Sequence, residues 1–230
     1  MSPESIKLLS NSLLYTMQVS VLVPMVIVWR RRQFPTPVKI LSWYVYLSAF
    51  CALSAKLGAI YLHHNLFFLI GFNVGKVLLF AAVYSLAMPT WKRVLKWTTI
   101  LGLVIVGSTM QYDMILALNV ARVVQCALLA GFALLYMDFS LTHADAPPGS
   151  QNPYWLLSVG QLVYSAGTVT GFSLDWIGQY SPFFMQLEMI CVALSGFVFN
   201  YFLTLAFLRA KPEEPTPQPA WQAAGQLVER

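Results

Sequence analysis

The sequence predicts an all-α, polytopic integral membrane protein folded as a bundle of seven transmembrane helices. Two observations lead to this prediction. Of the 230 residues, 58% are hydrophobic and only 10% are charged, and the mean hydropathy is +0.64, which argues against a disordered or soluble chain. Apolar stretches of roughly 18–25 residues also recur along the chain, each long enough to cross a hydrocarbon core of about 30 Å.

The expected spans are residues 9–29, 38–62, 66–88, 94–111, 114–137, 153–174 and 182–208. Because no backbone amide can stay unpaired in lipid, and because these stretches lack the alternating pattern of barrel strands, each should be a helix. An N-terminal segment, 1–8, and a proline-rich tail, 209–230, lie outside the bundle. No cleavable signal is evident, so the first span is expected to remain as a helix.

Positive charges predict the orientation of the bundle. Nine lysines and arginines fall on one side, namely Arg30, Arg31, Arg32, Lys39, Lys92, Arg93, Lys96, Arg209 and Lys211. By the positive-inside rule this side is cytoplasmic, which puts the N-terminus outside and the tail inside. The loop at 138–152 lacks lysine and arginine and does not contribute to this signal. A plasma membrane or bacterial inner membrane is the expected location.

The net charge of +5 is therefore attributed to a basic collar facing anionic lipid head groups, and no nucleic-acid partner is expected. Most tryptophans lie near span ends, where interfacial anchors belong; these are Trp29, Trp43, Trp91, Trp97, Trp155 and Trp176. The cysteines, Cys51, Cys126 and Cys191, are expected to be buried thiols within the spans.

Polar residues recur at helical spacing inside several spans. The first span carries Asn11, Tyr15 and Gln18 on one face, and Pro24 predicts a kink further along it. The other polar positions are Lys56 on the second span, Asn73 and Lys76 on the third, Asn119, Arg122 and Gln125 on the fifth, and Ser158, Gln161, Ser165, Thr168 and Asp175 on the sixth.

Four ionisable residues, Lys56, Lys76, Arg122 and Glu188, fall in the outer half of the predicted bundle. Three cations facing lipid would cost about 8–10 kcal/mol together, so they should face the interior. Cations outnumber acids there, which predicts a pocket for a small anionic ligand that opens outward. The predicted ligand-binding residues are Lys76, Arg122, Glu188, Lys56, Asn73, Asn119, Gln125 and Thr168.

The inner halves of the spans are poor in strongly polar groups, with Ser158, Gln161 and Asn200 as the main exceptions. This asymmetry favours a receptor or sensor that passes a signal to a separate partner at its cytoplasmic face. A small-solute transporter is the first alternative, since it needs a polar route on both sides of the midplane. The second alternative is an accessory membrane subunit whose polar cluster only fixes the bundle.

Sequence motifs of catalysis are missing: there is no HExxH, no GxSxG elbow and no Walker loop. We therefore expect no enzyme activity, no cofactor and no metal site. Two GxxxG motifs, Gly71 to Gly75 and Gly167 to Gly171, predict close helix packing within the bundle.

Overall fold

A computed structural model describes residues 3–31, 33–63, 65–142, 149–178 and 182–211, and no strand occurs among them. The tail that was predicted to be cytoplasmic lies mostly outside this part, from residue 212 on, and the side chain of Asp175 is also outside it. The helices are α1 (Pro3–Ser20), α2 (Leu22–Arg30), α3 (Thr36–Leu57), α4 (Leu66–Ala87), α5 (Lys92–Met110), α6 (Met114–Thr142), α7 (Pro153–Gly178) and α8 (Pro182–Arg209). A π-helical turn, η1 (Gly58–Leu62), extends α3, and a 3₁₀ turn, η2 (Pro89–Trp91), precedes α5.

Each expected span overlaps one of these helices, or, for the first span, the pair α1 and α2. Within the described residues, six helices are long and apolar enough to cross a membrane: Glu4–Arg30, Thr36–Tyr61, Leu66–Ala87, Pro89–Met110, Met114–Thr142 and Phe183–Arg209. Their lengths and compositions indicate a multi-pass membrane protein. Helix α7 is not one of the six. It is long enough, at 26 residues, and it carries the polar stripe of the sixth expected span.

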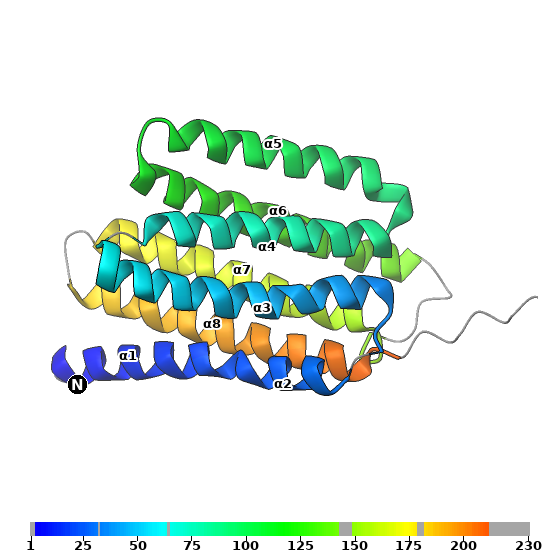
Figure 1. The fold of residues 1–230 in the computed structure, drawn as a ribbon, viewed down its shortest axis with the longest axis horizontal. Coiled ribbons are helices and arrows are strands. Elements are labelled where there is room, and N and C mark those ends of the chain that lie inside the picture. Colours follow the sequence, from blue (N-terminus) through cyan, green and yellow to red (C-terminus); the bar gives the residue numbers. More distant parts are fainter. Residues whose placement is uncertain (1–2, 32, 64, 143–148, 179–181, 212–230) are drawn as a thin grey trace, which may run out of the picture.

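The long helices lie roughly parallel to one another in a single bundle (Figure 1). Helix α5 lies on one side, where it packs against α4 and α6, and α1 and α2 lie on the opposite side against α8. Between them, α3 packs on α4, α4 on α6, α6 on α7, and α7 on α8. The bundle thus has two ends, which we call the α1 end, where α1 begins, and the α2 end, where α2 finishes.

The first span is interrupted at Val21, which is a turn residue between α1 and α2. Pro24 has no N–H to donate to the carbonyl four residues earlier, so the helix cannot continue unbroken through this point. Asn200 of α8 supports the break, because its Nδ2 donates to Ser20 Oγ at 2.7 Å and to the Met17 carbonyl at 3.5 Å. The interruption is local, because Val21 keeps helical dihedral angles (φ −62°, ψ −23°), and it lies three residues before Pro24, where a proline disrupts the helical hydrogen bonds.

The α2 half of the bundle is filled by side chains. Its core contains large residues from α3, α4, α6 and α8, among them Leu41, Phe80, Tyr84, Phe132 and Phe207. Buried hydroxyls in this half are satisfied: Tyr84 and Ser158 share a hydrogen bond of 2.9 Å. Ser158, one of the few polar residues predicted in the inner half, thus serves packing.

Glycines allow α7 and α8 to approach closely. A Cβ atom on Gly160 would lie 2.7 Å from the Phe202 Cβ, and one on Gly167 would fall on Ser195 of α8. Gly171 likewise faces Val192 and Glu188. The second GxxxG motif therefore packs within the bundle, whereas Gly71 of the first motif has no atom within 4 Å of such a Cβ.

Candidate functional site

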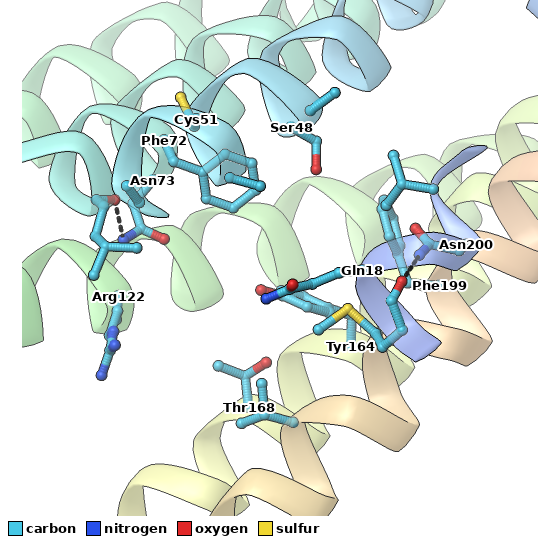
Figure 2. A pocket seen from close by; sticks show the side chains of 18 of the residues that line it. Gln18, Ser48, Cys51, Phe72, Asn73, Arg122, Tyr164, Thr168, Phe199 and Asn200 are labelled. Atoms are coloured by element: carbon cyan, nitrogen blue, oxygen red, sulfur yellow. Dashed lines mark hydrogen bonds between the residues drawn. The ribbon is translucent and has the colours of Figure 1, made fainter. Parts of the chain in front are cut away.

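A cavity of about 580 Å³ lies in the α1 half of the bundle. Its wall comes from α1 and α2 on one side, from α3 and α4, and from α6, α7 and α8 (Figure 2). Helices α4 and α6 contribute residues of their first halves, whereas α3 and α7 run the opposite way and contribute residues of their second halves. Antiparallel neighbours thus bring distant segments of the chain to one end, and the volume is in the range of small-molecule sites.

Six of the eight residues predicted to bind a ligand line this cavity: Lys56, Asn73, Arg122, Gln125, Thr168 and Glu188. They come from α3, α4, α6, α7 and α8, so only the folded bundle brings them together. In Figure 2, Arg122 and Thr168 project from α6 and α7, on the side of the cavity opposite Ser48 and Cys51 of α3. The arrangement brings amides, a hydroxyl, a carboxyl and two basic groups to one hollow.

Asn119 is not brought to the cavity, because it lies exposed on the first turns of α6. The three polar residues predicted on this helix, Asn119, Arg122 and Gln125, are spaced three positions apart. Each step of three residues rotates by about 300°, which is about 60° short of a full turn. Gln125 is therefore fully inward at 1% exposure, Arg122 is half-buried at the edge, and Asn119 has turned out of the bundle.

Lys76 is completely buried near the middle of α4 and does not line the cavity. Four aromatic rings surround its amine. Nζ lies 3.5 Å from the ring centroid of Tyr164, 4.5 Å from Phe199, 5.5 Å from Tyr44 and 5.9 Å from Phe80. Three of these residues, Tyr164, Phe199 and Tyr44, do line the cavity, so they form an aromatic floor with the lysine behind it. Lys76, which was predicted to bind the ligand directly, thus lies behind the cavity wall.

Several buried polar atoms beside the cavity form no hydrogen bond. These atoms are Lys76 Nζ, Gln125 Nε2, Gln161 Oε1 and Thr168 Oγ1. The Tyr164 side chain approaches Thr168 and Gln125, but neither gains a hydrogen bond that meets the usual geometry. Native proteins rarely leave buried polar atoms without partners, and each such atom calls for an explanation. Gln125 and Thr168 both contribute to the cavity wall, but the two atoms are themselves buried, so a bound molecule would supply the missing partners only after these side chains turn toward it.

The two basic residues of the wall each lie near an aromatic ring. Arg122 Cζ is 5.1 Å from the centroid of Phe172 on α7, and Lys56 Nζ is 5.6 Å from the centroid of Tyr15 on α1. Ring faces attract cations weakly compared with carboxylates or phosphates. Both groups therefore keep the capacity to bind an anion in the cavity.

Sequence reasoning missed most of the aromatic lining. Tyr44, Phe72, Tyr164, Phe172 and Phe199 all contribute to the wall, but aromatic residues occur throughout these apolar spans and give no periodic signal. Gln18 also lines the cavity. The sequence did indicate Gln18, because it shares a helix face with Tyr15 at a spacing of three.

Among the described residues, no group of three or more histidine, cysteine, aspartate or glutamate side chains could hold a metal ion. The three cysteines are free; Cys51 and Cys126 are buried and Cys191 is half-buried. Comparison of the chain with protein-family models, with curated proteins and with solved structures finds no match.

Proposed function

We propose that this protein is a seven-helix membrane receptor or sensor that binds a small anionic ligand in the cavity of its α1 half. The observation that carries the proposal is the pair of buried, unpartnered atoms, Gln125 Nε2 and Thr168 Oγ1, on two residues of the cavity wall that Arg122 and Lys56 also form. An anion accepts hydrogen bonds from the amide, the hydroxyl and the guanidinium together. Asn73 and Glu188 would set direction and charge balance, and Lys76 would add positive charge from behind the aromatic floor.

Helix α7 would be the seventh span. The residues of its polar stripe, Ser158, Gln161, Ser165 and Thr168, are all buried, with exposures of 0–5%, so they face the interior of the bundle. The exposed Thr170 and Ser173 donate their hydroxyls to the carbonyls of Ala166 and Val169 on the same helix. Buried polar faces of this kind are compatible with a membrane span. Seven crossings put the two ends of the chain on opposite sides of the membrane.

The positive charges support an orientation with the N-terminus outside. Eight of the nine predicted collar residues are described, and all eight are exposed at the α2 end: Arg30, Arg31, Lys39, Lys92, Arg93, Lys96, Arg209 and Lys211. The cavity lies in the opposite half. By the positive-inside rule the α2 end would face the cytoplasm and the cavity would belong to the outer half. A signalling partner would then dock at the α2 end.

Exchange of Arg122 for glutamine tests the anion site. We expect butyrate, but not butanol, to stabilise the purified protein, because only the carboxylate accepts charge-assisted hydrogen bonds. In Arg122→Gln the affinity for butyrate should fall about 10–100-fold, equivalent to roughly 1.5–3 kcal/mol for a hydrogen bond to a charged group. Affinity is measured from the ligand-dependent rise in melting temperature in detergent-free nanodiscs.

The matched control is Arg93→Gln, because Arg93 is exposed at the start of α5 and outside the cavity. This variant should bind butyrate as the wild type does. Equal losses of butyrate affinity in the two variants would mean that only the overall positive charge of the protein matters. If no carboxylate stabilises the wild type or either variant, the anion site is absent and the accessory-subunit alternative is favoured.

Cysteine accessibility separates the receptor from a transporter. The test uses a background in which the three native cysteines are replaced, with Asn73→Cys in the cavity and Ser158→Cys in the packed α2 half. An impermeant thiol reagent applied to sealed vesicles should label Asn73→Cys from the side of the N-terminus only and leave Ser158→Cys unlabelled, because aromatic packing closes that half. Labelling of either position from the cytoplasmic side would show alternating access and favour the transporter.

A further inference from the structure

Two rows of exposed residues border the cavity, and Gln18 of one row points into it (Figure 2). One row comes from α1 and α2, and the other from α3 and η1; together they are Tyr15, Gln18, Leu22, Ala52, Lys56 and Ala59. Each row covers eight positions at spacings of three and four, so each follows one side of its segment over about 10 Å. The rows form the two lips of a slot that runs along the helix axes.

Helix packing explains the slot. Helix α2 packs against both α3 and α8, whereas α1 packs against α8 and diverges from α3. The break between α1 and α2 falls at Val21, three residues before Pro24. It lies where α1 begins to diverge from α3. Across the slot, the structure places Lys56 Nζ 5.6 Å from the Tyr15 ring. Lys56 and Tyr15 thus narrow the slot toward the α1 end, whereas beside Leu22 the α3 lip carries only the small side chain of Ala52, which leaves more room there.

The position of the slot decides what can pass through it. In a bundle that spans a bilayer, an opening between two peripheral helices and parallel to their axes faces acyl chains rather than bulk water. The slot residues Leu22 and Ala52 are apolar. The groups able to hold an anion, Arg122, Gln125 and Thr168, belong to α6 and α7 on the far wall. The slot is therefore apolar toward the α2 half, at Leu22 and Ala52, and polar toward the α1 end, at Tyr15 and Lys56, while the inner wall is polar.

On the basis of the anion site proposed above, we propose that the ligand is a single-chain fatty carboxylate that enters sideways from the bilayer between α1 and α3. Its carboxylate would accept hydrogen bonds from Arg122, Gln125 and Thr168, and its alkyl chain would lie in the slot between Leu22 and Ala52. A cavity of about 580 Å³ is of the size that holds one drug-sized molecule, which favours one chain over a two-chain phospholipid.

The test fills the slot without touching the anion site. Ala52→Phe adds a ring at the lip, and Leu53→Phe adds one at the next residue, which is 60% exposed and does not line the cavity. Affinities for dodecanoate and butyrate are measured in nanodiscs. We expect the ratio of dodecanoate to butyrate affinity to fall at least 10-fold in Ala52→Phe and to stay unchanged in Leu53→Phe. Because partition into the bilayer is the same for all variants, it cancels in this comparison.

A second measurement uses the unaltered protein, so that a folding defect in a variant cannot decide the matter. A dodecanoate with a terminal diazirine, activated by light, should label the segments around residues 15–22 and 52–59, and dodecanoate should compete with it while dodecanol should not. Equal competition by dodecanol, or labelling elsewhere on the bundle, would overturn the fatty-carboxylate proposal. Butyrate could bind while Ala52→Phe leaves the ratio of dodecanoate to butyrate affinity unchanged and the label falls outside the slot. In that case the lateral route is wrong and the anion site is retained. If no carboxylate binds, both proposals fail.

Discussion

Replacing Lys76 with methionine raises the stability of the ligand-free protein. The amine is completely buried and has no hydrogen-bond partner, and an unsatisfied buried polar group costs about 1–3 kcal/mol. Methionine has a similar length, has no group that needs a partner, and packs well against aromatic rings. We expect a gain of about 2 kcal/mol, or roughly 4–8 °C in melting temperature for a chain of this size. Thermal unfolding in nanodiscs measures it.

Lys96→Met is the control, because Lys96 is exposed on α5 and its replacement should leave the melting temperature unchanged. Lys76→Met should also weaken carboxylate binding if the buried charge contributes to the site from behind Tyr164. Gain of stability together with loss of affinity is the pattern of a functional group kept at a cost to the fold. A lower melting temperature would mean that the four aromatic rings hold the amine more firmly than they pack against methionine.

The helices were predictable from sequence because the lipid core imposes a length and an apolar composition on each span. All seven expected spans overlap observed helices, and the first of them is interrupted three residues before Pro24. The sequence could not show that the break would fall at Val21, since this depends on the contacts that Asn200 makes with Ser20 and Met17. It also could not show that α1 would pack against α8 and diverge from α3, which is what opens the slot.

The polar lining was predictable in part, because helical spacing determines which residues share a face. Spacing alone leaves uncertain how the helix is rotated about its axis, and on α6 this separates Gln125, which is inside, from Asn119, which is outside. Lys76 was predicted to face the interior of the bundle and is completely buried, but its aromatic surroundings were not predicted. They come from α3, α4, α7 and α8, and no local pattern in the sequence links these helices.

Removing the Tyr164 side chain opens the space around Lys76 to the cavity. The ring lies between the two, since it lines the cavity and its centroid is 3.5 Å from Lys76 Nζ. Reductive methylation with formaldehyde and a borohydride reagent, followed by mass spectrometry, should leave Lys76 unmodified in the wild type and modify it at least 10-fold more in Tyr164→Ala. Loss of a large buried aromatic side chain costs about 3–5 kcal/mol, so labelling is done at low temperature on protein shown to be folded.

Tyr84→Ala distinguishes an opened path from general loosening. Whereas Tyr164 is only partly buried, Tyr84 is completely buried, sits one turn beyond Phe80 on α4 and lines no part of the cavity. Its removal creates a hole of similar size in the packed half. Lys76 should stay unmodified in this variant, while the exposed Lys56 is modified in all proteins and reports that the reagent works. Modification of Lys76 in both alanine variants would mean that the bundle has loosened, and modification in the wild type would mean that Tyr164 does not close the floor. Modification in Tyr164→Ala alone would identify Tyr164 as the side chain that separates the ligand cavity from the buried amine, and therefore as the residue whose movement would bring Lys76 into contact with a bound anion.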